Sequence, residues 1–176
     1  MANEPITIYK LIILYTLSRV ETTLPQDILY DYIIKQGYTN YFNAQNALSE
    51  LLQADLVWED ATYHLAYYGL TKAGEDTLAL FGNQLSPDIR GEIDEYLKKN
   101  RMEILNETSL VSDYERTPQG TYLASCTLRE GNHVLFQLAL EAATEEDARK
   151  ICENWRESSE ELYRMAVTRL LRGKQD

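Results

Sequence analysis

The chain contains few of the residues that build metal sites and catalytic centres. It has only two cysteines and two histidines in 176 residues. Cys126 and Cys152 lack the spacing of zinc or redox motifs, and His64 and His133 stand alone in the sequence. It contains no glycine-rich phosphate loop and no nucleophile elbow. The sequence therefore predicts a protein that is not an enzyme, with no catalytic residues, no metal and no cofactor.

The chain also lacks a long hydrophobic run. The longest one, residues 11–15, is far shorter than the roughly 20 apolar residues that a membrane-spanning helix needs. The first residues show neither the basic segment nor the small-residue cleavage site of a signal peptide. With no export signal, the two cysteines are expected to be free thiols in a reducing compartment. We therefore expect a cytoplasmic protein with no membrane partner.

Positive charge is scarce in both halves. The formal net charge is −11: residues 1–85 carry four basic against ten acidic residues, and residues 86–176 carry thirteen against eighteen. Proteins that bind nucleic-acid phosphates usually have a basic excess, and neither half has one. The sequence leaves open whether the cations of the first half cluster in space; they are Lys10, Arg19, Lys35 and Lys72.

Three helices are expected at the start of the chain. Residues 6–20 are apolar and of helical length. Pro25 suits the first position of a second helix, which would end at Gly37. Thr39 or Asn40 can cap a third helix. At 100° per residue, one face of that helix is apolar (Ala44, Ala47, Leu48, Leu51, Leu52) and the other largely polar (Phe42, Asn43, Asn46, Ser49, Glu50, Gln53).

A hairpin and a fourth helix follow. Residues 56–59 and 62–70 have the composition of strands, with a turn at residues 60–61. Thr71 can cap the next helix, which would run to Phe81, and Gly74 would allow it to approach its neighbours closely.

The motif Tyr68-x-Leu70-Thr71-x-x-Gly74 closes this segment. It resembles the junction between wing and helix in bacterial winged-helix regulators of the PadR and MarR kind, and the resemblance covers residues 6–82. The whole chain also resembles an uncharacterised bacterial winged-helix family that carries only a domain-of-unknown-function label, number 4364. The resemblance implies a winged helix-turn-helix and binding to DNA.

The second half is expected to pair a small sheet with a long helix. A helix opens at Pro87, and strands follow at residues 105–116, 122–129 and 133–142. A helix from residue 144 to 171 would be near 40 Å long at about 1.5 Å per residue, too long for a three-stranded sheet to cover. The apolar stripe should therefore pack against the other domain or a second subunit, and we expect a homodimer whose candidate contacts are Trp155, Leu162, Ala166 and Leu170.

The candidate DNA-contacting residues lie on the third helix, its approach and the hairpin region. Amides there could pair with adenine edges, and Phe42 could press on a thymine methyl group. The alternative is a solvated polar face with Phe42 folded back over the helix start. The full set is Thr39, Asn40, Phe42, Asn43, Gln45, Asn46, Ser49, Tyr63 and Lys72.

The expected fold class is α+β: a winged helix-turn-helix over residues 1–84, then residues 85–176 with a helix, a three-stranded antiparallel sheet and a long C-terminal helix. The expected function is a transcriptional regulator that binds double-stranded DNA as a dimer. The alternative is a winged-helix module that binds a protein partner and not DNA. A small-molecule effector is a third option, and it would require an apolar pocket between the sheet and the long helix.

Overall fold

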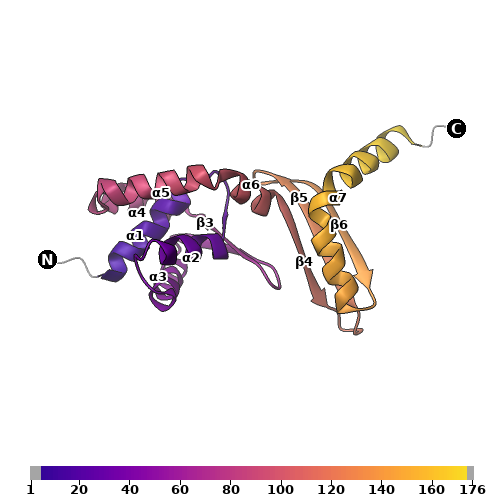
Figure 1. Ribbon diagram of the computed structural model, residues 1–176, viewed down its shortest axis with the longest axis horizontal. Coiled ribbons are helices and arrows are strands. Elements are labelled where there is room, and N and C mark those ends of the chain that lie inside the picture. Colours follow the sequence, from indigo (N-terminus) through magenta and orange to yellow (C-terminus); the bar gives the residue numbers. More distant parts are fainter. Residues whose placement is uncertain (1–4, 174–176) are drawn as a thin grey trace. The chain divides into compact units, whose positions relative to one another are not determined.

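The computed structural model describes residues 5–173 and has the expected α+β class (Figure 1). It contains two antiparallel sheets of three strands each, and seven α-helices lie within residues 5–173. The chain divides into two compact units, Met1–Thr108 and Ser109–Asp176. This division falls two helices later than the expected boundary between residues 84 and 85, because the helices after residue 85 bury side chains in the first unit's core.

Three helices form the base of the first unit: α1 (Pro5–Ser18), α2 (Gln26–Lys35) and α3 (Tyr41–Gln53). Helix α1 is buried around most of its circumference, and Leu11, Ile12, Ile13 and Leu14 are each at most 3% exposed. The predicted apolar face of α3 is confirmed, with Ala44, Ala47, Leu48 and Leu51 buried and Leu52 packed at the edge of the core.

A three-stranded sheet with the order β1-β3-β2 lies in the same unit. The hairpin strands β2 (Val57–Ala61) and β3 (Ala66–Leu70) pair antiparallel as expected, although the turn lies at residues 62–65 and not at 60–61. The third strand, β1 (Leu24–Pro25), was not expected. A strand of two residues is too short to show an alternating pattern. Pro25 occupies the position just before α2, without a capping hydrogen bond, and is not the first helical residue.

The junction after the hairpin follows the sequence prediction closely. Thr71 caps α4 (Lys72–Phe81), and its Oγ1 accepts a hydrogen bond of 3.0 Å from the Gly74 backbone nitrogen. A Cβ at Gly74 would lie 2.1 Å from the carbonyl oxygen of Leu56, so only glycine fits this close approach. A short 3-10 helix, η1 (Gly82–Gln84), then ends the segment.

Two further helices complete the first unit: α5 (Pro87–Lys99) and α6 (Arg101–Ser109). They contribute Ile93, Leu97 and Ile104 to the core. The expected strand from residue 105 is therefore wrong over its first five residues. Ile104 and Thr108, four residues apart, are both buried on one face of α6, whereas the strand β4 begins at Leu110.

The second unit consists of an antiparallel sheet and one long helix. The strands β4 (Leu110–Arg116), β5 (Tyr122–Glu130) and β6 (His133–Ala142) lie in that order. On the sheet face that packs against the helix, Ala124 and Cys126 are fully buried. A register shift between Leu128 and Arg129 interrupts the regular pairing of β5 with β6, and Val134, which pairs with Arg129 beyond the shift, is 52% exposed.

Helix α7 (Glu145–Arg172) packs across this sheet with its first half and continues past the strands with its second (Figure 1). Thr144 caps it, accepting a hydrogen bond of 3.1 Å from the Asp147 backbone nitrogen. The buried positions are Ala148, Trp155 and Ser159, and no described residue of the helix after Ser159 is buried. The second half leaves Leu170 and Leu171 more than 80% exposed.

Candidate nucleic-acid interface

The start of α3 is built by a local hydrogen bond and an aromatic contact. The Asn40 side chain accepts a hydrogen bond of 2.9 Å from the Asn43 backbone nitrogen, which confirms Asn40 as the cap. The Tyr41 ring meets Tyr30 of α2 edge to face, with 5.1 Å between the centroids. These contacts hold the first turn of α3 against α2 while Tyr41 stays half exposed to solvent.

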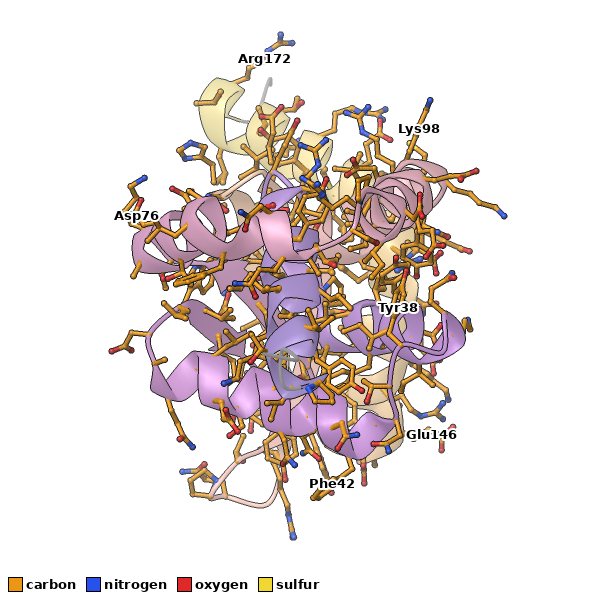
Figure 2. The ribbon with its side chains drawn as sticks, turned by 90° about the vertical axis from the view of Figure 1, so that its left-hand side faces the viewer. Tyr38, Phe42, Asp76, Lys98, Glu146 and Arg172 are labelled. Carbon is orange, nitrogen blue, oxygen red and sulfur yellow. The ribbon has the colours of Figure 1, made fainter. Side chains whose placement is uncertain are left out.

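The predicted contact residues of α3 divide into two groups. Phe42, Gln45 and Ser49 are exposed on the outer side of the helix, together with Asn40. Phe42 is 68% exposed, so the alternative in which it folds back over the helix start is wrong. Figure 2 shows its side chain below the ribbon of α3, directed away from the body of the unit. These side chains form one accessible surface.

The other three predicted residues are less accessible. Asn43, Asn46 and Thr39 are half-buried. Asn43 lines a cavity of about 320 Å³ together with Pro5, Ile6 and Tyr9 of α1. The Thr39 Oγ1 is buried and has no hydrogen-bond partner among residues 5–173.

The hairpin presents aromatic side chains. Tyr63, in the turn, is 71% exposed, and its ring lies edge to face with His64 at 4.7 Å between centroids. Trp58 lies across Gly69 of the facing strand, so close that a Cβ there would be 2.3 Å from the indole ring. The indole remains 40% exposed. The hairpin thus offers rings and hydroxyl groups at its surface.

Tyr68 fixes an acidic group beside the hairpin. Its hydroxyl oxygen lies 2.9 Å from Glu59 Oε1 and 3.1 Å from Gln26 Oε1. Burial, and then the hydrogen bond to Glu59, raise the pKa of Tyr68 well above its usual value of 10.0. The phenol therefore stays neutral and donates to the carboxylate. This hydrogen bond holds the Glu59 side chain in place at the hairpin.

The four basic side chains of residues 1–85 are all paired with carboxylates. Two pair with carboxylates that are distant in sequence, Lys10 with Glu50 and Arg19 with Asp94. The other two pair within their own helix, Lys35 with Asp31, and Lys72 with Glu75 and Asp76. Hydrogen bonds to Glu75 and then Asp76 raise the pKa of Lys72, so it stays charged and paired. None of these four side chains is therefore an unpaired cation.

The candidate dimer contacts on α7 also divide into two groups. Trp155 is 3% exposed, donates a 3.3 Å hydrogen bond from Nε1 to the Thr127 carbonyl, and packs against Phe136. It belongs to the core of its own unit and is not accessible to a partner. Leu162 is 36% and Leu170 84% exposed, and Ala166 is half-buried.

The two cysteines pack together, one on β5 and one on α7. Cys126 is fully buried, Cys152 is half-buried, and neither forms a disulfide. A hydrogen bond to Cys152, and then burial, raise the pKa of the Cys126 thiol. A raised pKa disfavours the reactive thiolate, so this pair packs as small apolar side chains.

The first unit also contains a cavity of about 370 Å³ that no sequence pattern predicted. It is lined by the residues just after α1 and by α5 and α6. Its lining segments lie some seventy residues apart in the chain and share no motif. Only the packing of α5 against α1 brings them together, so no local pattern could have indicated it.

The family comparison covers almost the whole chain. The model of a domain of unknown function, DUF4364, matches residues 9–170, and the chain therefore belongs to this family. No curated protein and no solved structure matches it.

Within residues 5–173, no helix combines the length and apolarity needed to cross a membrane. Over the same range, the side chains that commonly ligate metals do not come together in groups of three or more.

Proposed function

We propose that the first unit is a winged helix of the PadR and MarR kind and that the protein is a cytoplasmic transcriptional regulator that binds duplex DNA as a dimer. The order of elements supports the proposal. Three helices are followed by a hairpin, and β1, between α1 and α2, adds a third strand to the hairpin's sheet. Helices α2 and α3 are joined by residues 36–40, five residues, close to the roughly three or four of a helix-turn-helix.

The single observation that carries this proposal is the outer face of α3. Phe42, Gln45 and Ser49 are exposed on one side of a helix whose opposite side is sealed in the core. A helix anchored in this way can enter the major groove of DNA, where a glutamine pairs with adenine and an aromatic ring contacts a thymine methyl group. The β2–β3 hairpin would lie beside it, and Tyr63 can donate its hydroxyl to a phosphate.

The dimer would form through the second half of α7. Leu162, Leu170 and Leu171 are exposed, and charge is distributed unevenly around them. Glu160 and Glu161 lie just before Leu162, Arg164 pairs with Glu160 one turn later, and Arg169 and Arg172 flank Leu170 and Leu171 at the basic end. Two copies of the helix, packed antiparallel about a two-fold axis, would place the acidic end of one beside the basic end of the other. This complementarity favours a second copy of the same chain as the partner.

The test is selection from a pool of random-sequence DNA duplexes at low and at moderate salt. We expect enrichment of a sequence with two half-sites. Because each cation of residues 1–85 is ion-paired, few counterions should be released, and the salt dependence of affinity should be shallow. Gln45→Ala should weaken binding to the selected duplex about tenfold, since a good bidentate base contact contributes roughly 1–3 kcal/mol of discrimination.

Gln119→Ala is the matched control, because Gln119 is an exposed glutamine in the β4–β5 turn of the second unit. It should leave the affinity unchanged. If no sequence is enriched at either salt concentration, the DNA-binding proposal fails. If enrichment occurs but Gln45→Ala binds normally, α3 does not read the base pairs through this residue.

A second candidate function is recognition of a protein partner through the same surface. Two observations favour it: the cations are neutralised by ion pairs, and the exposed surface around α3 and the hairpin includes Tyr41, Phe42 and Tyr63. Aromatic side chains are enriched at the centre of protein interfaces. The double variant Phe42→Ala/Tyr63→Ala would weaken such a complex strongly, and the DNA selection would return nothing.

A further inference from the structure

The cavity of about 370 Å³ in the first unit combines an aliphatic wall with charged side chains. Val20, Leu97, Ile104 and Leu105 supply the apolar part of the lining. Its volume lies at the small end of the range of about 300–1,000 Å³ that holds organic ligands. The wall contains no aromatic ring, which fits an aliphatic chain better than a flat ring system.

Arg19 is held in a fixed orientation at this cavity. Its Nε donates to Asp94 Oδ1 at 2.8 Å, and the Tyr15 hydroxyl donates to Asp94 Oδ2 at 3.1 Å. The guanidinium carbon also lies 6.0 Å from the centre of the Tyr15 ring. Within residues 5–173, the guanidinium donates a hydrogen bond through Nε alone. Its two terminal amino groups have no hydrogen-bond partner there, and together they form the fork that binds a carboxylate through two hydrogen bonds.

The charges around the cavity limit what it can accept. Arg19, Lys98 and Arg101 are cationic, and Glu21 and Asp94 are anionic, which leaves an excess of one positive charge. Lys98 and Arg101 form no ion pair within the part of the chain that the structure describes, and Figure 2 shows Lys98 projecting from α5. One excess charge suits a monoanion, whereas a phosphate dianion would face two carboxylates.

We infer that this cavity binds an aliphatic monocarboxylate of medium chain length, with the carboxylate on the free amino groups of Arg19 and the alkyl chain against Val20, Leu97, Ile104 and Leu105. Apolar burial supplies affinity, and Arg19 supplies selection for the anion. The inference does not depend on DNA binding, because the residues of the cavity lie outside α3 and the hairpin. It assigns the first unit a ligand site that sequence reasoning expected, if anywhere, between the sheet and the long helix.

Calorimetric titration of the full-length protein with sodium octanoate, below its micelle concentration, tests the inference. We expect saturable binding at one site. Arg19→Ala should weaken it at least about tenfold, because a hydrogen bond to a charged group contributes about 1.5–3 kcal/mol. Arg19→Lys keeps the charge but lacks the two amino groups. Its affinity for octanoate should lie between those of the unaltered protein and of Arg19→Ala. Octanol, with the same chain and no charge, and acetate, with the charge and no chain, should both bind much more weakly.

Lys99→Ala is the matched control, since Lys99 is exposed, neighbours Lys98 on α5 and does not line the cavity. It should bind octanoate like the unaltered protein, whereas Lys98→Glu, which reverses the local charge balance, should weaken binding. Circular dichroism of each variant checks that it is folded. No binding of octanoate, equal binding of octanol, or unchanged affinity in a folded Arg19→Ala protein would each overturn the inference.

Discussion

The two units bury their apolar side chains to different degrees. The first unit encloses large aliphatic and aromatic side chains, among them Tyr32, Ile33 and Leu48, at 2% exposure or less. The buried cluster of the second unit is made of three alanines, Ala124, Ala142 and Ala148, and the side chains packed against it, Tyr114, Tyr122, Ile151 and Cys152, are only partly buried. Burial of apolar surface stabilises a fold by roughly 25 cal/mol per Å², so the second unit gains much less from its own core.

This difference concerns what each unit needs in order to be stable. The second unit spans fewer than 70 residues, a length at which a single core stabilises a fold only marginally. At the same time it exposes Val134, Leu140, Leu170 and Leu171. The first unit is stabilised by its own buried core. The proposed dimer depends on the apolar surface that the second unit leaves exposed. Four predictions test the comparison.

The largest expected effect is loss of the dimer. Leu170→Glu places a charge in the proposed interface, where it would be desolvated without a partner. The protein should then elute and scatter light as a monomer, while the unaltered protein has the mass of a dimer at the same concentration. Leu80→Glu is the control, because Leu80 is an exposed leucine of α4 in the first unit, at 72% exposure. A monomeric mass for the unaltered protein would remove the dimer from the proposal.

The next largest effect is a cavity in the first unit's core. Leu48→Ala should lower the free energy of unfolding by about 2–5 kcal/mol, since Leu48 is 2% exposed. Trp58 lies in the first unit and Trp155 in the second, so variants that retain one tryptophan report on each unit separately. In urea titrations, the fluorescence of Trp58 should report the lowered free energy of unfolding. The fluorescence of Trp155 should report a much smaller decrease. Equal losses would mean that the units unfold together.

Alkaline pH should lower the stability of the first unit. Burial, followed by the charges of Tyr41 and Glu59, raises the pKa of Tyr30 from 10.0 to about 12. Below pH 10 this hydroxyl is neutral in both states, so its contribution to stability is fully present. Between pH 10 and 12 it ionises first in the unfolded chain, and stability falls as the pH rises, on the order of 2 kcal/mol for this group.

Urea unfolding monitored by Trp58 at a series of pH values measures this loss. Tyr30→Phe should make the decline shallower, because phenylalanine has no group to ionise. Burial also raises the pKa values of Tyr38 and Tyr68, so the decline should become shallower without vanishing. A slope identical to that of the unaltered protein would show that Tyr30 does not contribute.

The smallest predicted effects come from two glycines that differ in their surroundings. Gly74→Ala should cost about 1–3 kcal/mol, because its Cβ would lie 2.1 Å from the Leu56 carbonyl oxygen and force the backbone apart. Gly91 lies inside α5, and a Cβ there would meet nothing within 4 Å. Gly91→Ala should therefore stabilise the protein by up to about 1 kcal/mol through its higher helix propensity. In thermal unfolding, Gly74→Ala should lower the melting temperature and Gly91→Ala should raise it. Shifts in the same direction would contradict the prediction.

Much of the fold could be predicted from local patterns. The apolar face of α3, the caps at Asn40, Thr71 and Thr144, and the strands β5 and β6 follow from residue spacing, because each depends on neighbours within about four positions. The short strand β1 and the helix α6 could not be found in this way. A two-residue strand has no periodicity, and residues 105–109 alternate loosely as a strand would while packing as a helix.

The candidate site was less accessible to such reasoning. The sequence named Phe42, Gln45 and Ser49 among the candidate contacts, and all three are exposed, whereas Asn43 and Asn46 of the predicted polar face are half-buried. It could not assign partners to the cations, because Arg19 meets Asp94 and Lys10 meets Glu50 only after α1 has packed against other helices. For the same reason it counted Trp155 among the dimer contacts, although the sheet encloses it.

By itself, then, the sequence of this DUF4364 protein determined which segments become helices and hairpins and which side of each is apolar, since periodicity and capping act over a single turn. Tertiary packing alone decided which charges are neutralised, which apolar side chains stay uncovered, and where a cavity opens beside Arg19. Each of these depends on residues from separate elements meeting in space, and hydrophobic packing, which is nondirectional along the chain, brings them together only in the folded state.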